Sequence, residues 1–120
     1  RLRWLPKVVC MASVEAACRA AAAAALACRL MIDASHGNSQ KKPGNQVAVV
    51  GAIAAQLAAG EARIFGVMVE SHLQAGRQDL VRGKPLVYGQ SITDGCLGWS
   101  DSMAVLEQLS GAVRERRKKK

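Results

Sequence analysis

The sequence predicts an α/β fold with parallel strands, and two observations carry this prediction. Residues 29–33 and 63–70 have the length and apolar composition of strands, and the second is apolar throughout its centre, as parallel strands covered on both faces are. Helical patterns precede, separate and follow the two strands, and such alternation is typical of parallel α/β proteins. With 120 residues, the chain has room for at most one ordinary domain.

Each expected element has a local reason. The first helix is rich in alanine, which has the highest helix propensity, and Ser13 is its expected N-cap. The second helix is expected to start at Pro43, because the first position of a helix does not need the N–H that proline lacks, and to end at Gly60. In order, we expect a helix (13–27), a strand (29–33), a polar loop (35–42), a helix (43–60), a strand (63–70) and a long loop (71–100). A last helix follows, capped by Ser100 or Asp101. The expected apolar faces of the last two helices are Val47, Val50, Ala54 and Leu57, and Val105, Leu106, Leu109 and Val113.

Two strands do not complete a parallel sheet, because each needs parallel neighbours that this stretch does not contain. The loop over residues 71–100 is also long for a compact domain. Both features predict a piece of a larger α/β barrel. Functional groups of such folds gather at the carboxyl ends of the strands, where residues 33–36 and 70–72 fall.

The net charge of +8 comes from the two ends of the chain, because residues 8–113 sum to zero. A basic end binds polyanions weakly, but the body lacks the clustered basic face of a nucleic-acid-binding domain. We therefore expect no specific nucleic-acid partner. We divide the chain into an atypical N-terminal segment (1–12), a main part (13–117) and a basic tail (118–120).

The cysteines and the apolar stretches bear on the compartment. The four cysteines show neither a CxxC pair nor zinc-finger spacing, which favours reduced thiols and a cytoplasmic protein. The longest uncharged run, residues 43–60, is interrupted by Asn45, Gln46 and Gln56. That pattern suits a packed helix better than a membrane span, so we expect no membrane partner.

Both strands lead into ionisable groups, in the stretches LMIDASH (30–36) and GVMVESHLQAG (66–76). By themselves these residues leave alternatives open. A histidine at a strand end, such as His36, is often only a hydrogen-bonded structural residue. Glu70 and Asp94 by themselves suit helix caps or loop carboxylates equally well.

Three stretches together carry a more specific signal: MIDASHGNSQKK (31–42), GVMVESHLQAGRQDL (66–80) and YGQSITDGCLGW (88–99). They resemble consecutive signature stretches of type I 3-deoxy-D-arabino-heptulosonate 7-phosphate (DAHP) synthase. That enzyme condenses phosphoenolpyruvate with erythrose 4-phosphate at the entry to the shikimate pathway. The resemblance covers residues 13–117 and implies a C-terminal fragment: the last two strands of a (β/α)₈ TIM barrel with their helices. It also implies a homo-oligomer.

The resemblance further implies a divalent metal ion, Mn²⁺, Fe²⁺, Co²⁺ or Zn²⁺, bound by His36, Glu70 and Asp94, with Asp94 also catalytic. Imidazole and carboxylates suit such ions, which polarise carbonyl oxygens. His72 is expected to support Glu70, while Ser35 and Asn38 orient the site or satisfy the loop backbone.

The same resemblance implies what this stretch lacks. The family's cysteine ligand and the residues that hold the two phosphates match nothing here, so the isolated chain is expected to be inactive. The alternative function is a non-catalytic α/β module or assembly partner with a basic tail.

Overall fold

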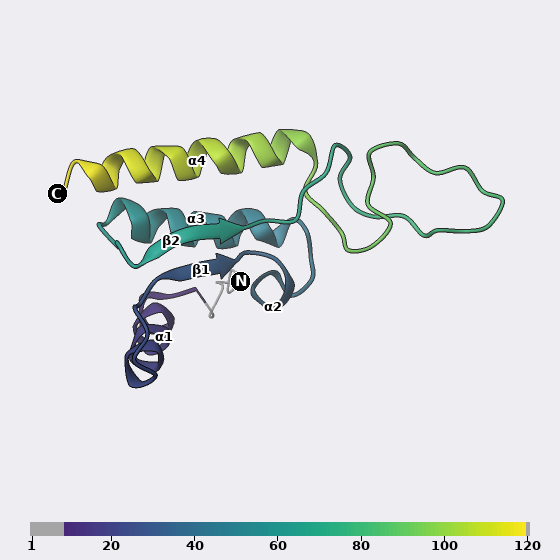
Figure 1. Cartoon of the computed structure of the whole chain (residues 1–120). Helices are drawn as coiled ribbons and strands as arrows, with labels where there is room; N and C mark the ends of the chain where they lie inside the picture. Colours follow the sequence, from purple (N-terminus) through teal and green to yellow (C-terminus); the bar gives the residue numbers. More distant parts are fainter. Residues whose placement is uncertain (1–8, 120) are drawn as a thin grey trace, which may run out of the picture.

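The structure, a computed structural model, describes residues 9–119 and alternates helices with strands as predicted (Figure 1). Its elements are α1 (Met11–Ala23), β1 (Leu30–Asp33), α2 (His36–Ser39), α3 (Asn45–Ala58), β2 (Ile64–Met68) and α4 (Trp99–Arg117). The short helix α2 lies where the sequence predicted a loop. Residues 1–8 of the predicted N-terminal segment, and residue 120 of the predicted tail, lie outside the described residues.

β1 and β2 form a parallel pair, as predicted. Leu30 pairs with Ile64 and Asp33 with Met68, with one irregularity after Leu30. The strands run opposite to α3 and α4, which pack along each other, so both strands end on the side where α2 begins (Figure 1). From the end of β2, the long loop before α4 projects away from the helices.

The core is aliphatic and is built mainly on α3. The side chains of Val49, Val50 and Ile53 are completely buried, and they pack with residues of β2, the loop and α4, including Ile64, Leu97 and Val105. Two residues expected on the apolar faces are exposed instead: Val47 (39%) and Leu106 (60%). Leu106 lies about 100° around the helix from the buried Val105, and this rotation turns its side chain to the exposed side of α4.

Helix α1 differs from its prediction at both ends. It begins at Met11 with Cys10 as its N-cap, so the expectation for Ser13 is wrong. It ends at Ala23 because Ala25 takes a left-handed conformation (φ 57°) and the Leu26 N–H donates to Ala21 O at 2.8 Å. This bond from the second residue beyond the cap is the Schellman arrangement. Alanine propensity alone predicted a longer helix.

The turn after α1 brings two cysteines together. Cys18 and Cys28 form a disulfide with their Cα atoms 4.9 Å apart, while Cys10 and Cys96 are free. The expectation of reduced thiols is therefore wrong for this pair. The separation of ten residues carries no recognisable pattern, and only the reversal of the chain beyond Ala23 places the two side chains side by side.

Salt bridges of Arg63 and hydrogen bonds of Arg116 join α1 and α4 to the start of β2. Arg63 donates to Glu61 at 2.8 Å and to Glu15 of α1 at 2.6 Å. Arg116 of α4 donates from Nη1 to the carbonyl oxygens of Glu61 and Ile64, both at 3.1 Å.

Among the helices within residues 9–119, none combines the length and hydropathy needed to cross a bilayer.

We predict that Glu61→Gln lowers the free energy of unfolding, by an amount that depends on pH. Hydrogen bonds from Arg63 lower the pKa of Glu61 to about 2, from an ordinary value of 4.5. A carboxyl whose pKa is lowered by folding stabilises the protein above its unfolded pKa, and this contribution disappears as the pH falls from 4.5 toward 2. The variant should lose about 2 kcal/mol at neutral pH and progressively less in acid. Urea unfolding at pH 7, 4.5 and 3 measures this.

The control for that experiment is Glu107→Gln, since Glu107 is an exposed residue of α4 without an ion pair among residues 9–119. It should change the free energy of unfolding little at any of these pH values. A Glu61→Gln deficit that is the same at pH 7 and pH 3 would contradict the assigned cause.

Candidate metal centre

Three side chains from three separate segments meet at the ends of the strands. His36 opens α2 just after β1, Glu70 follows β2, and Asp94 lies in the long loop. One nitrogen or oxygen atom from each lies within 4.8 Å of the others. His36 Nε2 is 3.7 Å from Glu70 Oε1 and 3.8 Å from Asp94 Oδ2. The structure thus brings together all three residues that the resemblance implied as ligands.

The imidazole of His36 is oriented by Asp33, the last residue of β1. Asp33 Oδ2 lies 2.7 Å from His36 Nδ1, and Asp33 Oδ1 accepts the Ser35 N–H at 2.7 Å. The hydrogen bond between Asp33 and the His36 ring, together with the negative charge of Asp33, raises the pKa of His36, and Glu70 and Asp94 make smaller contributions. Bonding through Nδ1 leaves Nε2 directed at the two carboxylates, which is how histidines that bind metals are commonly held.

Glu70 is held by its backbone as well as by its side chain. The Ser35 hydroxyl donates to Glu70 Oε2 at 2.5 Å. Gln46 of α3 is completely buried, and its amide accepts the Glu70 N–H at 2.8 Å and donates to the Glu70 carbonyl at 3.0 Å. The Leu97 N–H donates to the same carbonyl at 2.9 Å. Glu70 Oε1, the oxygen nearer His36, is therefore presented from a fixed backbone.

Asp94 is the most exposed of the three, at 64% against 45% for His36 and 22% for Glu70. The next residue, Gly95, passes so close to Pro43 that a Cβ would lie 2.6 Å from the proline ring, so only glycine fits there without a shift. The Cys96 thiol donates to the Asp94 carbonyl at 3.5 Å, and burial raises the pKa of that thiol.

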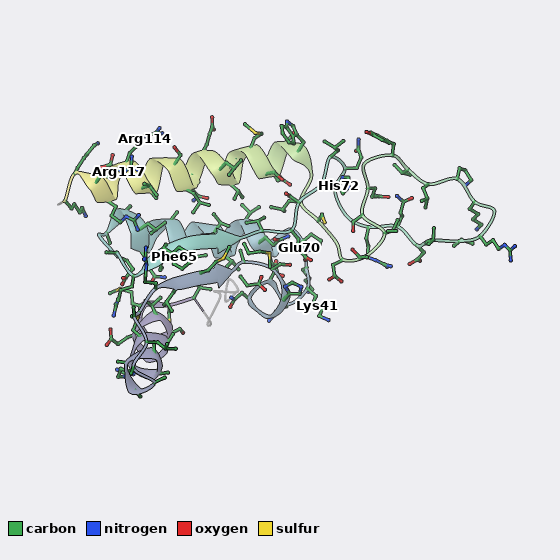
Figure 2. The ribbon with its side chains drawn as sticks, in the orientation of Figure 1. Lys41, Phe65, Glu70, His72, Arg114 and Arg117 are labelled. Carbon is green, nitrogen blue, oxygen red and sulfur yellow. A yellow bond between two sulfur atoms is a disulfide. The ribbon has the colours of Figure 1, made fainter. Side chains whose placement is uncertain are left out.

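The supporting residues expected from the sequence divide into two groups. Ser35 contacts Glu70, and Asn38 donates to the Asp33 carbonyl at 2.6 Å, so both buttress the site. The expectation for His72 is wrong. Its Nδ1 accepts the N–H of Leu73 at 2.8 Å, and it lies exposed at the start of the long loop (Figure 2).

Sequence reasoning placed Asp33 at the functional edge of the sheet without giving it a role, and it missed Gln46 and Lys41. Asp33 had a usable signal, because an acid three residues before a histidine at a strand end can reach its ring. Gln46 had a weaker one, as a glutamine within an otherwise apolar helix. Lys41 lines the same pocket as His36, Glu70 and Asp94, and Figure 2 shows it near Glu70.

The fold and this set of side chains define an α/β protein with a candidate metal centre at the carboxyl ends of its parallel strands. Residues 8–107 match the DAHP synthetase I family. The chain belongs to that family.

Individual relatives agree with this assignment. The chain is 57% identical over 89 residues to phospho-2-dehydro-3-deoxyheptonate aldolase of Haemophilus influenzae, covering 74% of this chain and 25% of that protein. It is 52% identical over 94 residues to the Phe-sensitive aldolase of Escherichia coli K12, covering 78% and 27%. The structure of phospho-2-dehydro-3-deoxyheptonate aldolase from Francisella tularensis matches with a TM-score of 0.84 and 41% identity, over 90% of this chain and 31% of that one. The chain thus spans about a quarter of the curated relatives' length.

We predict that Gln46→Met destabilises the protein by about 1–3 kcal/mol. The change roughly conserves side-chain volume but replaces a polar amide with an apolar thioether, so it leaves the N–H of Glu70 without its partner in a partly buried place. Urea unfolding measures the loss. Gln108→Met, on the exposed side of α4, is the matched control and should change stability by less than about 0.5 kcal/mol. Equal losses for the two variants would show that the Gln46 bridge does not stabilise this site.

Proposed function

We propose that the chain carries the metal-binding part of a type I DAHP synthase, the enzyme that condenses phosphoenolpyruvate with erythrose 4-phosphate. The observation that carries this proposal is the convergence of His36, Glu70 and Asp94 to within 4.8 Å, in a chain of the DAHP synthetase I family. The relatives are named phospho-2-dehydro-3-deoxyheptonate aldolase, which supports the same activity for the complete protein.

The residues present fit a divalent transition metal. One imidazole nitrogen and two carboxylate oxygens suit Mn²⁺, Fe²⁺, Co²⁺ or Zn²⁺, and a cysteine outside this chain would complete the set. Such an ion supplies Lewis-acid polarisation of the aldehyde oxygen of erythrose 4-phosphate. Asp33 holds the His36 ring so that Nε2 faces the site, and Ser35 occupies one oxygen of Glu70 while leaving the other toward His36.

Two further residues are placed to meet the substrates. Asp94 is the proposed catalytic residue as well as a ligand, because its largely exposed carboxylate borders the pocket from the solvent side. Lys41 lines the same pocket and brings a positive charge to a place where anionic substrates must bind. Attraction of this kind offsets the mutual repulsion of two phosphorylated substrates.

The barrel assignment is part of the proposal. We place β1 and β2 as the last two strands of a (β/α)₈ barrel, with the rest of the barrel covering what is open here. Within residues 9–119 each strand has one unpaired edge, and the side chains of Met31 and Phe65 on this sheet are 61% and 59% exposed. Open edges of this kind pair readily with other strands, which the rest of a barrel would supply.

We predict that the chain binds Mn²⁺ or Zn²⁺ weakly and that His36→Ala reduces the affinity at least tenfold, because a site of three ligands loses one. Isothermal titration calorimetry measures the affinity. His72→Ala is the matched control, since His72 is exposed and hydrogen-bonded to its neighbour. Equal affinities of wild type and His36→Ala would refute the metal assignment.

We also predict that the 120-residue chain alone does not catalyse the condensation. Catalysis requires both substrates to be held close together in the reactive orientation. This segment contributes the candidate metal ligands of the pocket but not the family's phosphate-binding stretches. The assay follows the loss of phosphoenolpyruvate absorbance with erythrose 4-phosphate and Mn²⁺. Adding the separately expressed N-terminal part of the Haemophilus relative should produce turnover, and Glu70→Ala should abolish it. Turnover by the chain alone that Glu70→Ala removes would contradict this prediction.

A further inference from the structure

The segment before Asp94 is tied to a distant part of the long loop by an arginine. Arg77 Nε donates to the carbonyl oxygen of Thr93 at 2.7 Å, and Arg77 Nη2 donates to Asp79 Oδ1 at 2.6 Å. Thr93 is the residue directly before Asp94. The guanidinium therefore joins the beginning of the loop to its end, at the point where the candidate ligand is attached.

Neighbouring contacts reinforce this crossing. Arg77 and Ser91 form an isolated parallel bridge, and the Gln78 N–H donates to the Ser91 carbonyl at 2.8 Å. The Ser91 hydroxyl in turn accepts the Thr93 N–H at 3.1 Å. Both polar groups of the Thr93 backbone are thus held, one by Ser91 and the other by Arg77.

The other side of Asp94 is held differently. Gly95 lies against Pro43, and Cys96 exchanges two backbone hydrogen bonds with Gly76, at 2.8 and 3.0 Å. The Asp94 carboxylate itself is 64% exposed, and its one polar side-chain contact within residues 9–119 is the 3.8 Å approach to His36. Its direction therefore depends on the backbone at both flanks rather than on packing of the side chain.

We propose that Arg77 is a positioning residue for Asp94: by binding the Thr93 carbonyl, it holds the carboxylate where His36 and Glu70 can share a metal ion with it. This inference rests on the proposed function. A lysine does not replace the arginine, because a single ammonium lacks the fixed fork that reaches the Thr93 carbonyl and Asp79 together. Groups that orient metal ligands in this way typically contribute ten- to a hundredfold to metal affinity.

The test measures Mn²⁺ affinity of the full 120-residue chain by electron paramagnetic resonance titration, for wild type and for Arg77→Gln, Arg77→Lys and Arg82→Gln. We expect Arg77→Gln and Arg77→Lys to bind about tenfold more weakly or worse. Arg82 lies on the same loop without a hydrogen bond or ion pair among residues 9–119, so Arg82→Gln removes the same charge and should bind like wild type. The loss of an arginine charge by itself strengthens the binding of a cation, so weaker Mn²⁺ binding by Arg77→Gln cannot come from the change in charge.

A second measurement tests whether the effect of Arg77 on metal affinity passes through Asp94. In an Asp94→Asn background, Arg77→Gln should cause no further loss of Mn²⁺ affinity, since its effect passes through Asp94. An undiminished loss in that background would overturn the inference, as would equal affinities of Arg77→Gln and Arg82→Gln. Failure of the wild-type chain to bind Mn²⁺ would contradict both the proposed function and the role of Arg77. Binding by wild type that Arg77→Gln leaves unchanged would contradict the role of Arg77 alone, so the two failures are distinguishable.

Discussion

The parallel register of β1 and β2 is the constraint on which the candidate site depends. Asp33 pairs with Met68, and the Ala34 N–H donates to the Met68 carbonyl at 2.9 Å, so the two chains leave the sheet side by side. Two residues later, Ser35 and Glu70 meet through a hydrogen bond. Because side chains alternate between faces along a strand, a slip of one residue would turn the Glu70 side chain away from His36.

The three candidate ligands are held by different forces. His36 and Glu70 are anchored beside the core, through the strands and through the fully buried Gln46. Asp94 belongs to a loop that is ordered mainly by polar contacts, such as those of the Gln78 side chain with Val87 at 2.8 Å. A segment with few buried apolar contacts opens at a lower free energy than a core strand. Hydrogen bonds at the base of this loop therefore decide whether the third carboxylate stays in place.

Much of this arrangement could be predicted from the sequence, because its signals are local. The two apolar segments specify strands wherever they are placed, and their alternation with helical patterns specifies a parallel pairing. Each of the stretches that contain His36, Glu70 and Asp94 is continuous in the chain, so its residue types and their order can be read directly. The meeting of His36 and Glu70 follows from strand ends that share one edge, whereas Asp94 reaches them through the long loop.

Only the tertiary structure decided the features that depend on contacts between distant residues. Gln46 and Glu70 are 24 positions apart, and a glutamine within an apolar helix does not by itself identify Glu70 as the partner of its two hydrogen bonds. The early end of α1 and the Cys18–Cys28 disulfide likewise follow from a reversal of the chain that alanine propensity opposes. Arg77 appears in the sequence as one more loop cation. Its role arises because folding brings the Thr93 carbonyl within 2.7 Å of its guanidinium, and an unpaired backbone carbonyl takes the nearest donor.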